Sequence, residues 1–266
     1  QTLTDVSSNL HFSIQAWAMQ LAQMADGELP LVHSVSFGED ETELPSTAYM
    51  EACNLEFQKL GLRGASILVA SGDSGVWGRS GSPPDGAFRP DFPASSPFVT
   101  AVGGTVLQQE GTLGAERAWA SGGGGFSNIF SRPSYQDAAV NAYLVRANLP
   151  DQQHWNASGR AYPDVSALAG SSLDGQGYCV SVDGKSFNGF TGTSASTPVW
   201  AAVIARLNGL RLAAGKMAVR CLSQSVAKEY GKQGVHAVHL RMDCTYESAR
   251  NKDMFEAMGM GEMFQQ

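Results

Sequence analysis

The spacing of apolar side chains predicts that helices and strands alternate in the first third of the chain. Apolar positions recur every three or four residues in 12–26, and again in 46–64 between a capping serine and glycine stops, so both segments are predicted helices. The continuous apolar runs in 31–37 and 65–73 predict buried strands. This order indicates an α/β fold with a parallel sheet, in which ligands bind beyond the carboxyl ends of the strands.

The middle of the chain has a less regular pattern. Residues 74–97 are rich in Gly, Pro and Ser and predict a long loop, and loops of this length in compact domains tend to be functional or disordered. A short strand is predicted at 98–105 and a short helix at 134–145. Between them, the segment 121–128 carries almost no side chains. No internal repeat is visible.

The composition changes near residue 213, after which charged residues and methionines replace the high content of Gly, Ser and Pro. We therefore expect two parts of different origin, residues 1–212 and residues 213–266. With 266 residues, of which 43% are hydrophobic, the chain can bury a sizeable core as one large domain or two small ones. It begins with Gln and shows no signal segment, which predicts a processed form, a single domain or a fragment.

The charge of the chain excludes some partners. Its net charge is −7, with 18 Lys and Arg against 25 Asp and Glu, which argues against a nucleic-acid partner. No run approaches the roughly 20 apolar residues that a membrane helix needs. The four cysteines are widely spaced without a C-x-x-C motif, so disulfide pairing and redox compartment stay open: Cys53, Cys179, Cys221 and Cys244. The oligomeric state also stays open.

Ser194 is the first candidate for chemistry. It follows a Gly-Thr step and precedes an apolar segment with a proline suited to the first turn of a helix. A serine there lies in the positive end of the helix macrodipole, which favours an alkoxide or a bound anion. The same position also suits an N-cap serine on a core helix, so both interpretations are open.

Two further segments offer chemistry near the ends of strands. The run ASGDSG places Asp73 at the carboxyl edge of the sheet, where an active site is expected, although aspartates are also common in simple turns. The run SGGGGFS, which begins at Ser121, offers backbone N–H and C=O groups that can pair with an extended peptide. Its alternative interpretation is a flexible glycine loop.

Taken together, these segments resemble the sedolisin family of serine-carboxyl peptidases. The runs that carry the resemblance occur in the family's order across roughly residues 12–212: SVSFGEDE, ILVASGDSG, FRPDFPASSPFVTAVGGT, SGGGGFSNIFSRPSYQ, NASGRAYPDVSAL and GTSASTPVWAAVIARLN. The resemblance implies a subtilisin-like parallel sheet flanked by helices. It also implies hydrolysis of peptide bonds at acidic pH, by an endopeptidase or a tripeptidyl aminopeptidase.

The resemblance assigns roles to individual residues. Ser194 matches the nucleophile, and Asp73 matches the aspartate of the oxyanion hole, where a carboxyl donates a hydrogen bond only when it is protonated and so calls for low pH. The substrate-binding wall matches Ser121, Gly122, Gly123 and Gly124. Asn156 matches an N-glycosylation acceptor, which implies a lysosomal protein, or alternatively a secreted one. The implied partner is a peptide or protein substrate.

One part of the family's machinery is missing from the sequence. Family members activate the serine with a glutamate, which an aspartate four residues later orients on the same helix. No aspartate in this chain has a glutamate four residues before it. Gln1 and Asp5 have the spacing, but glutamine cannot act as a general base. We therefore expect impaired peptidase activity, and the alternative is an inactive fragment that binds peptides or is inert.

The end of the chain also departs from the family. The oxygen-rich loop of the family's calcium site is absent after Leu212, so no metal or cofactor is expected. Residues 213–266 instead resemble the helix and following strand of short-chain dehydrogenases/reductases, with Lys216 at the place of the catalytic lysine. Leu212 stands where the catalytic tyrosine is expected, and no dinucleotide loop precedes it, so an NADPH-dependent oxidoreductase is the least supported function. One hypothesis accounts for both departures from the family. The chain is a composite of two parts, and its subtilisin-like fold is incomplete at both ends.

Overall fold

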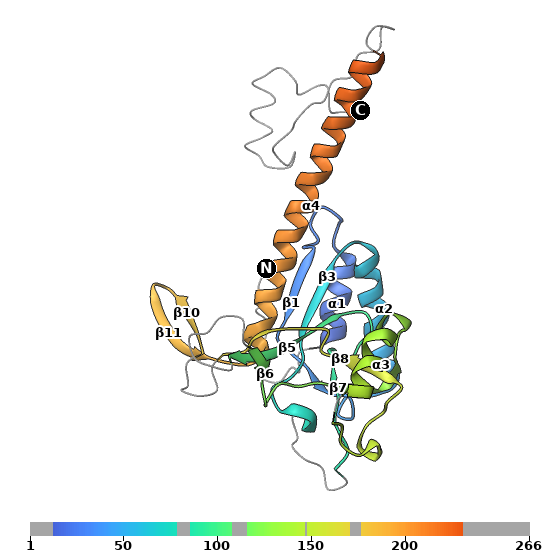
Figure 1. The fold of residues 1–266 in the computed structure, drawn as a ribbon, viewed down its shortest axis with the longest axis vertical. Coiled ribbons are helices and arrows are strands. Elements are labelled where there is room, and N and C mark those ends of the chain that lie inside the picture. Colours follow the sequence, from blue (N-terminus) through green and yellow to red (C-terminus); the bar gives the residue numbers. More distant parts are fainter. Residues whose placement is uncertain (1–12, 79–85, 108–115, 147, 171–176, 231–266) are drawn as a thin grey trace. The chain divides into compact units, whose positions relative to one another are not determined.

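The computed structural model describes most of the chain (Figure 1). The described ranges are 13–78, 86–107, 116–146, 148–170 and 177–230. The expected degenerate pair Gln1 and Asp5, and the strand expected in the tail, lie outside these ranges. The chain divides into two units, Gln1–Leu207 and Asn208–Gln266, which are considered separately.

The first unit is built on a largely parallel sheet. Its strands follow the order β1-β3-β5-β6, with β9 also paired to β5. The first three and β9 run parallel, whereas β6 is antiparallel to β5. The bounds are β1 Val32–Val35, β3 Ser66–Ala70, β5 Thr100–Leu107, β6 Glu116–Ala118 and β9 Val165–Leu168. This arrangement confirms the predicted α/β class.

One helix before β1 and one after it confirm the two helices that the apolar periodicity predicts. α1 (Ile14–Gln23) begins where Ser13 Oγ accepts the N–H of Ala16 at 3.2 Å. α2 (Thr47–Leu62) begins where Ser46 Oγ accepts the N–H of Tyr49 at 3.1 Å. Such side-chain caps satisfy the free N–H groups of a first helical turn, so both helix starts could be predicted from local sequence.

The side chains of β3 alternate between two cores, because successive residues of a strand point to opposite faces. Ile67 and Val69 belong to the main core, together with residues of α1 and α2 such as Ile14 and Phe57. Leu68 belongs to a smaller core with Ala201 of α4 (Thr193–Tyr230). Helices therefore cover both faces of the sheet, which explains why its strands read as continuous apolar runs.

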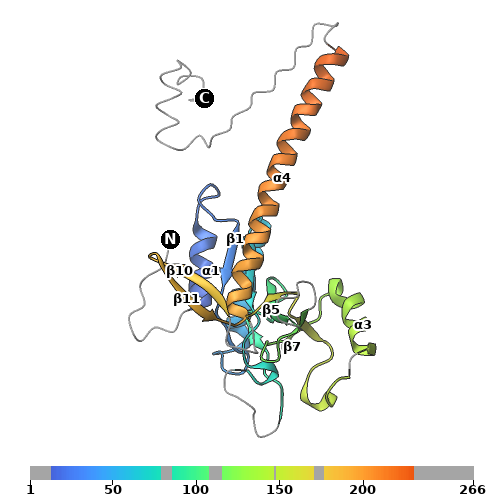
Figure 2. The same cartoon turned by 60° about the vertical axis from the view of Figure 1, so that its left-hand side comes forward.

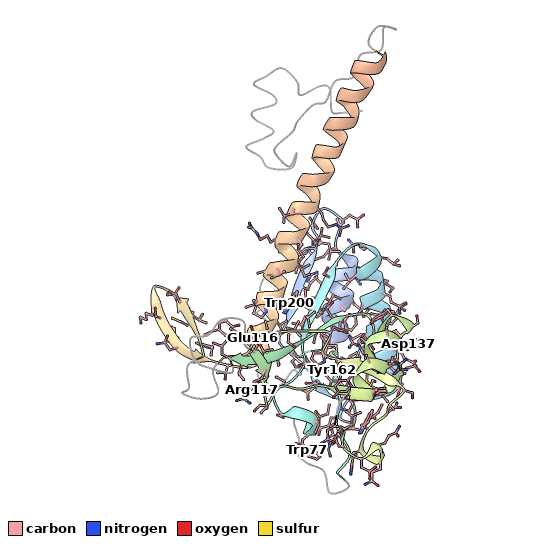
Figure 3. All side chains as sticks on the ribbon, viewed as in Figure 1. Trp77, Glu116, Arg117, Asp137, Tyr162 and Trp200 are labelled. Atoms are coloured by element: carbon pink, nitrogen blue, oxygen red, sulfur yellow. The ribbon has the colours of Figure 1, made fainter. Side chains whose placement is uncertain are left out.

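The long helix α4 (Thr193–Tyr230) follows directly from a β-hairpin, as Figure 2 shows. Its second turn packs on the sheet, where the indole Nε1 of Trp200 donates to Ser166 O at 2.8 Å (Figure 3). The helix continues without interruption past residue 212. The expected boundary at 212 and 213 stays a prediction. Within the described residues, no helix is both long and apolar enough to cross a membrane.

The irregular middle contains more order than its composition predicts. The expectation of a plain loop at 74–97 was incomplete, because it holds a 3-10 turn and a short strand that pairs with β2. The remaining bounds are β2 Glu39–Asp40, η1 Gly75–Trp77, β4 Asp91–Phe92, β7 Gly125–Ser131, η2 Ser134–Gln136, α3 Asp137–Arg146, η3 Gln152–His154, β8 Gly159–Tyr162, β10 Tyr178–Val182 and β11 Lys185–Phe190. A two-residue strand beside a proline leaves no periodic signal, which is why β4 was not predicted.

A buried arginine joins several of these segments. Arg160 in β8 is fully buried, and its guanidinium donates to Ser96 O at 3.0 Å, Val99 O at 3.2 Å and Asp164 Oδ2 at 2.6 Å. The Asp164 carboxylate also accepts the N–H of Ala101 in β5 at 2.7 Å. Charge-assisted bonds of this kind are strong and short, so this cluster fixes β5 relative to β8 and β9.

Candidate active site

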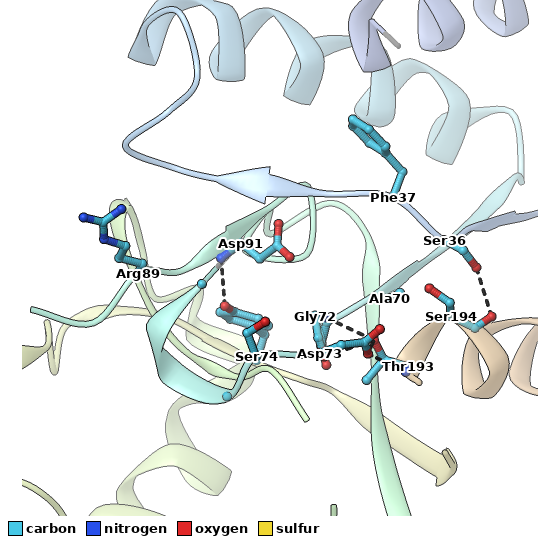
Figure 4. A pocket seen from close by; sticks show the side chains of 14 residues that line it. Ser36, Phe37, Ala70, Gly72, Asp73, Ser74, Arg89, Asp91, Thr193 and Ser194 are labelled. Atoms are coloured by element: carbon cyan, nitrogen blue, oxygen red, sulfur yellow. Dashed lines mark hydrogen bonds between the residues drawn. The ribbon is translucent and has the colours of Figure 1, made fainter. Parts of the chain in front are cut away.

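The carboxyl end of β3 turns sharply at Gly72 and presents Asp73. Gly72 has a φ of 107°, a left-handed conformation that glycine adopts without strain. The exposed Asp73 carboxylate accepts two hydrogen bonds through Oδ1, from Thr193 N at 2.7 Å and from Thr193 Oγ1 at 2.8 Å (Figure 4). Gly72 N also donates to Thr193 Oγ1 at 3.2 Å. The turn after β3 is thereby bonded to the start of α4.

The start of α4 is shaped by Gly192 and held by two strands. Gly192 has a φ of 120°, and a Cβ at this position would lie 2.9 Å from Asp73 Oδ2. Thr193 is fully buried, whereas the next residue, Ser194, is exposed. The carbonyl of Ser194 accepts a hydrogen bond from Ser36 Oγ, just beyond β1, at 3.0 Å.

This geometry decides between the two interpretations of Ser194. The helix begins at Thr193, so Ser194 is its second residue and does not occupy the N-cap position. The N–H of Thr193 is satisfied instead by the carboxylate of Asp73, from a distant part of the sequence. Among the described residues, no hydrogen bond to Ser194 Oγ is found. Its hydroxyl is therefore left available at the amino end of a helix.

Ser194 and Asp73 line one pocket of roughly 100 Å³ at the carboxyl ends of β1 and β3 (Figure 4). The pocket also contains Arg89, Asp91 and Tyr162, which the sequence analysis did not single out. Asp91 is buried, and its backbone N–H donates to the phenolic oxygen of Tyr162 at 2.8 Å. The signal that could have found Arg89 and Asp91 is the run FRPDFP, which places two charges among apolar residues and prolines.

The carboxylate of Asp91 lies against bare backbone. A Cβ added at Gly38 would lie 2.3 Å from Asp91 Oδ1, and one at Gly72 would lie 3.1 Å from Asp91 Oδ2. Burial raises the pKa of the neighbouring Tyr162 phenol well above its usual range, and the charge of Asp91 adds to this effect. Tyr162 is therefore neutral at any pH at which the protein would work, and it acts in the pocket as a hydrogen-bonding group.

The glycine-rich segment lies against the same turn. Gly123 N donates to Gly72 O at 2.7 Å, and Gly123 O accepts from Ser71 Oγ at 2.8 Å. The expectation that the whole segment offers free backbone groups is therefore wrong for Gly123, whose groups are both used internally. Gly124 makes no such bond within the described part of the chain, and β7 begins immediately after it. The roles of Ser121, Gly122, Gly123 and Gly124 in binding substrate stay predictions.

Gly123→Ala is expected to destabilise the folded protein by at least about 2 kcal/mol, because overpacking against rigid backbone has no inexpensive relaxation. The added Cβ would lie 2.1 Å from the carbonyl oxygen of Ser71. Urea unfolding measures the effect. Gly61→Ala is the matched control, since a Cβ there meets nothing within 4 Å, and helix propensity predicts unchanged or slightly increased stability. Equal stabilities for the two variants would contradict the observed packing.

Asn156 lies between η3 and β8 in a partly exposed turn. Its amide nitrogen donates to Ser127 O at 3.1 Å, and its amide oxygen accepts from Ser158 N at 3.1 Å and from Ser158 Oγ at 2.7 Å. The side chain thus already bonds to a neighbouring strand. Glycosylation at Asn156 stays a prediction.

The described residues contain no group of three or more His, Cys, Asp or Glu side chains able to hold a metal ion. The expected absence of the calcium site stays a prediction, because 231–266 lie outside the described ranges. The expected lack of a base that activates Ser194 also stays a prediction. The carboxylates that line the pocket are Asp73, which is engaged by Thr193, and the buried Asp91.

The sequence of this chain is similar to those of known peptidases. The model of the subtilase family matches residues 4–236. Tripeptidyl-peptidase 1 of Homo sapiens is 43% identical over 218 residues, which cover 81% of this chain and 37% of the human protein. The protein of the same name from Bos taurus is 41% identical over 241 residues, which cover 90% of this chain and 40% of the bovine protein. The chain thus spans about two fifths of the length of these relatives.

A solved structure agrees with the sequence matches. Pseudomonas sedolisin, a serine-carboxyl proteinase complexed with two molecules of pseudo-iodotyrostatin, superimposes with a TM-score of 0.54 at 25% identity, covering 76% of this chain and 54% of that chain. The likeness of the tail to dehydrogenases finds no support in these comparisons, and the subtilase match itself extends beyond residue 212. From its sequence, its sheet and its relatives, the chain belongs to the subtilase family of serine peptidases, within the sedolisin group.

Proposed function

We propose that this chain carries the nucleophile and the oxyanion site of a peptidase that hydrolyses peptide bonds at acidic pH, with tripeptides released from amino termini as the narrower activity. The observation that carries the proposal is the pair of bonds between Asp73 and Thr193. They place a carboxyl group beside an exposed serine at the amino end of a helix. A helix amino end and a carboxyl that can be protonated suit the negative charge that develops on a carbonyl oxygen under attack.

Each residue has a defined part in this reaction. Ser194 Oγ attacks the carbonyl carbon, and its proton must pass to a base as the new C–O bond forms. Asp73, protonated at the oxygen that Thr193 does not occupy, donates a hydrogen bond to the resulting oxyanion. The free backbone groups of Gly124 can pair with an extended substrate as an added strand. Without the family's glutamate, the proton transfer is slow, so the chain by itself is an impaired enzyme.

The setting of the reaction follows from the same features. Acid-dependent oxyanion chemistry and the glycosylation tripeptide at Asn156 favour a lysosomal protein, with secretion as the alternative. A peptide or protein is the expected partner. The net charge of −7 argues against nucleic acid.

The test is hydrolysis of a fluorogenic tripeptide amide at about pH 4 by wild type, Ser194→Ala and Ser186→Ala. Ser186 is an exposed serine in β11 and provides the matched control. Because a missing base removes most of the rate that the serine contributes, we expect the loss in Ser194→Ala to be about tenfold instead of several orders of magnitude. Ser186→Ala should retain the wild-type rate.

Equal rates in wild type and Ser194→Ala would reject hydrolysis through Ser194 and favour the second candidate, a protein that binds peptides without cleaving them. The free backbone of Gly124 beside β7 favours that candidate over a wholly inert fragment. Titration calorimetry with the same peptide separates the two. NADPH oxidation in the presence of carbonyl compounds tests the oxidoreductase alternative for the tail, for which we expect no activity.

A further inference from the structure

Glu41 is a buried carboxylate that has no part in the proposed hydrolysis. It directly follows β2 in the run GEDE and is 4% exposed. Its backbone N–H donates to Pro90 O at 2.9 Å, which fixes it beside β4. Its side chain accepts two hydrogen bonds from β7, from Ser127 Oγ at 2.5 Å and from Asn128 N at 2.9 Å. Glu41 thus connects the end of β2 to β7 through a bond between residues that are 86 positions apart in sequence.

Ser127, the partner of Glu41, is a fully buried junction within β7. Its hydroxyl oxygen accepts the N–H groups of Ile129 at 3.1 Å and Phe130 at 2.8 Å. A hydroxyl that accepts twice has one proton left to donate, and that proton goes to Glu41. The pairing of β7 with β8 shifts register between Phe126 and Ser131. Side-chain bonds through Ser127 therefore replace the regular ladder in this stretch.

The bonds to Glu41 lie close to the glycine-rich wall. β7 begins at Gly125, directly after Gly124, while Gly123 is bonded to the turn that precedes Asp73. The backbone from the wall into β7 is consequently bonded at Gly123 to Gly72, at Gly125 and Phe126 to β8, and at Ser127 and Asn128 to the carboxylate of Glu41. We expect loss of the bonds to Glu41 to weaken the hold on the start of β7.

We propose that Glu41 is a positioning residue, which holds the start of β7 so that the wall 121–124 stays aligned for an extended peptide. The inference rests on the proposed function only in the identity of the ligand. The alignment itself follows from the two bonds to β7. Loss of both would leave the proton of the buried Ser127 hydroxyl without its acceptor and the Asn128 N–H without its bond to Glu41, which favours opening of the segment.

The hold depends on pH in a direction that can be worked out. Burial raises the pKa of the Glu41 carboxyl above its ordinary value, and the bonds from Ser127 and Asn128 offset part of this rise. When the segment opens, water reaches the carboxyl and its pKa returns towards the ordinary value. Protonation therefore favours the closed segment, and the wall is held more firmly as the pH falls through the raised pKa and less firmly above it.

Other charged groups surround Glu41. Asp40 precedes it, Asp91 lies in the paired β4, and Tyr162 and Arg160 belong to β8, which pairs with β7. The Tyr162 phenol has a raised pKa and does not change its charge in acid, and Arg160 is bonded to Asp164. Because two further carboxylates lie near Glu41, a variant that removes only the charge of Glu41 is needed to assign a pH step to it.

The experiment measures hydrogen exchange across the full chain from pH 4 to pH 7, together with binding of a fluorescent tripeptide whose last peptide bond is a reduced, uncleavable isostere. Glu41→Ala should speed exchange in 121–131, leave α2 unchanged, and weaken peptide binding about tenfold. Glu41→Gln, which keeps one acceptor, should recover part of the binding. Glu51→Ala, on the exposed face of α2, is the control and should match wild type.

Wild type should show slower exchange in 121–131 as the pH falls, and Glu41→Gln should show no such step once intrinsic exchange is corrected. Two results would overturn the proposal: faster exchange throughout the chain in Glu41→Ala, or the same pH step in Glu41→Gln as in wild type. If exchange responds as expected but the peptide does not bind wild type, the proposed function fails and the positioning of the segment by Glu41 stands.

Discussion

Arg160→Met is expected to lower the free energy of unfolding by about 3–5 kcal/mol, a large fraction of the stability of a domain of this size. The substitution keeps most of the volume but removes every donor of a fully buried guanidinium. Asp164 would lose its ion-pair partner, and the carbonyls of Ser96 and Val99 would lose theirs. Buried groups left without a partner carry their full desolvation penalty. Urea unfolding followed by circular dichroism measures the change.

Arg117→Met is the control for this prediction. Arg117 lies in β6, is exposed, and should change stability by no more than about 0.5 kcal/mol when replaced. If Arg160→Met fails to fold, Arg160→Lys provides the measurement, because it keeps the charge but cannot bridge as many acceptors as the planar guanidinium. A stability of Arg160→Lys equal to that of wild type would show that the bonds to the carbonyls contribute nothing.

Asp73→Ala is expected to lower peptide hydrolysis by about a hundredfold, more than Ser194→Ala does. Oxyanion stabilisation acts on whatever nucleophile attacks, whereas the serine contributes little once its base is missing. The alanine also leaves the N–H of the buried Thr193 without its acceptor, so the start of α4 loses its cap. The rate for the fluorogenic tripeptide amide, measured from pH 3 to pH 7, gives the effect.

Asp73→Asn separates the two roles of Asp73. An asparagine side chain keeps one acceptor for Thr193 and donates a hydrogen bond without needing a proton. We therefore expect its residual activity to extend towards neutral pH, where the activity of wild type declines. Asp26→Asn, at an exposed surface ion pair with Arg63, is the control and should keep the wild-type profile. An unchanged profile in Asp73→Asn would count against a protonated Asp73 at the oxyanion.

The residues of the pocket could be predicted in part from sequence patterns, whereas the contacts between them required the tertiary structure. Ser194 and Asp73 were both predicted from short motifs and lie in one pocket. Neither motif indicated how they are joined, since the link passes through Thr193, a residue with no chemistry of its own. The interpretation of Ser194 as a cap was reasonable by position, and only the observed start of the helix at Thr193 excluded it.

The sequence by itself determined the structural features that depend only on residues close together in the chain. The period of apolar positions and the capping serines Ser13 and Ser46 fixed α1 and α2, because helix formation and capping are local. The apolar runs of β1 and β3 predicted a buried parallel sheet for the same reason. The motifs around Ser194 and Asp73 marked the strand and helix ends at which chemistry takes place.

What only the tertiary structure decided is the pairing of polar groups that are far apart in sequence. Nothing near Glu41 predicts that it holds Ser127, and nothing near Arg160 predicts that it binds Val99. The closed backbone of Gly123 is of the same kind, because it depends on the approach of the turn after β3. A hydrogen bond requires two groups about 3 Å apart, and packing of the whole sheet decides which distant groups meet.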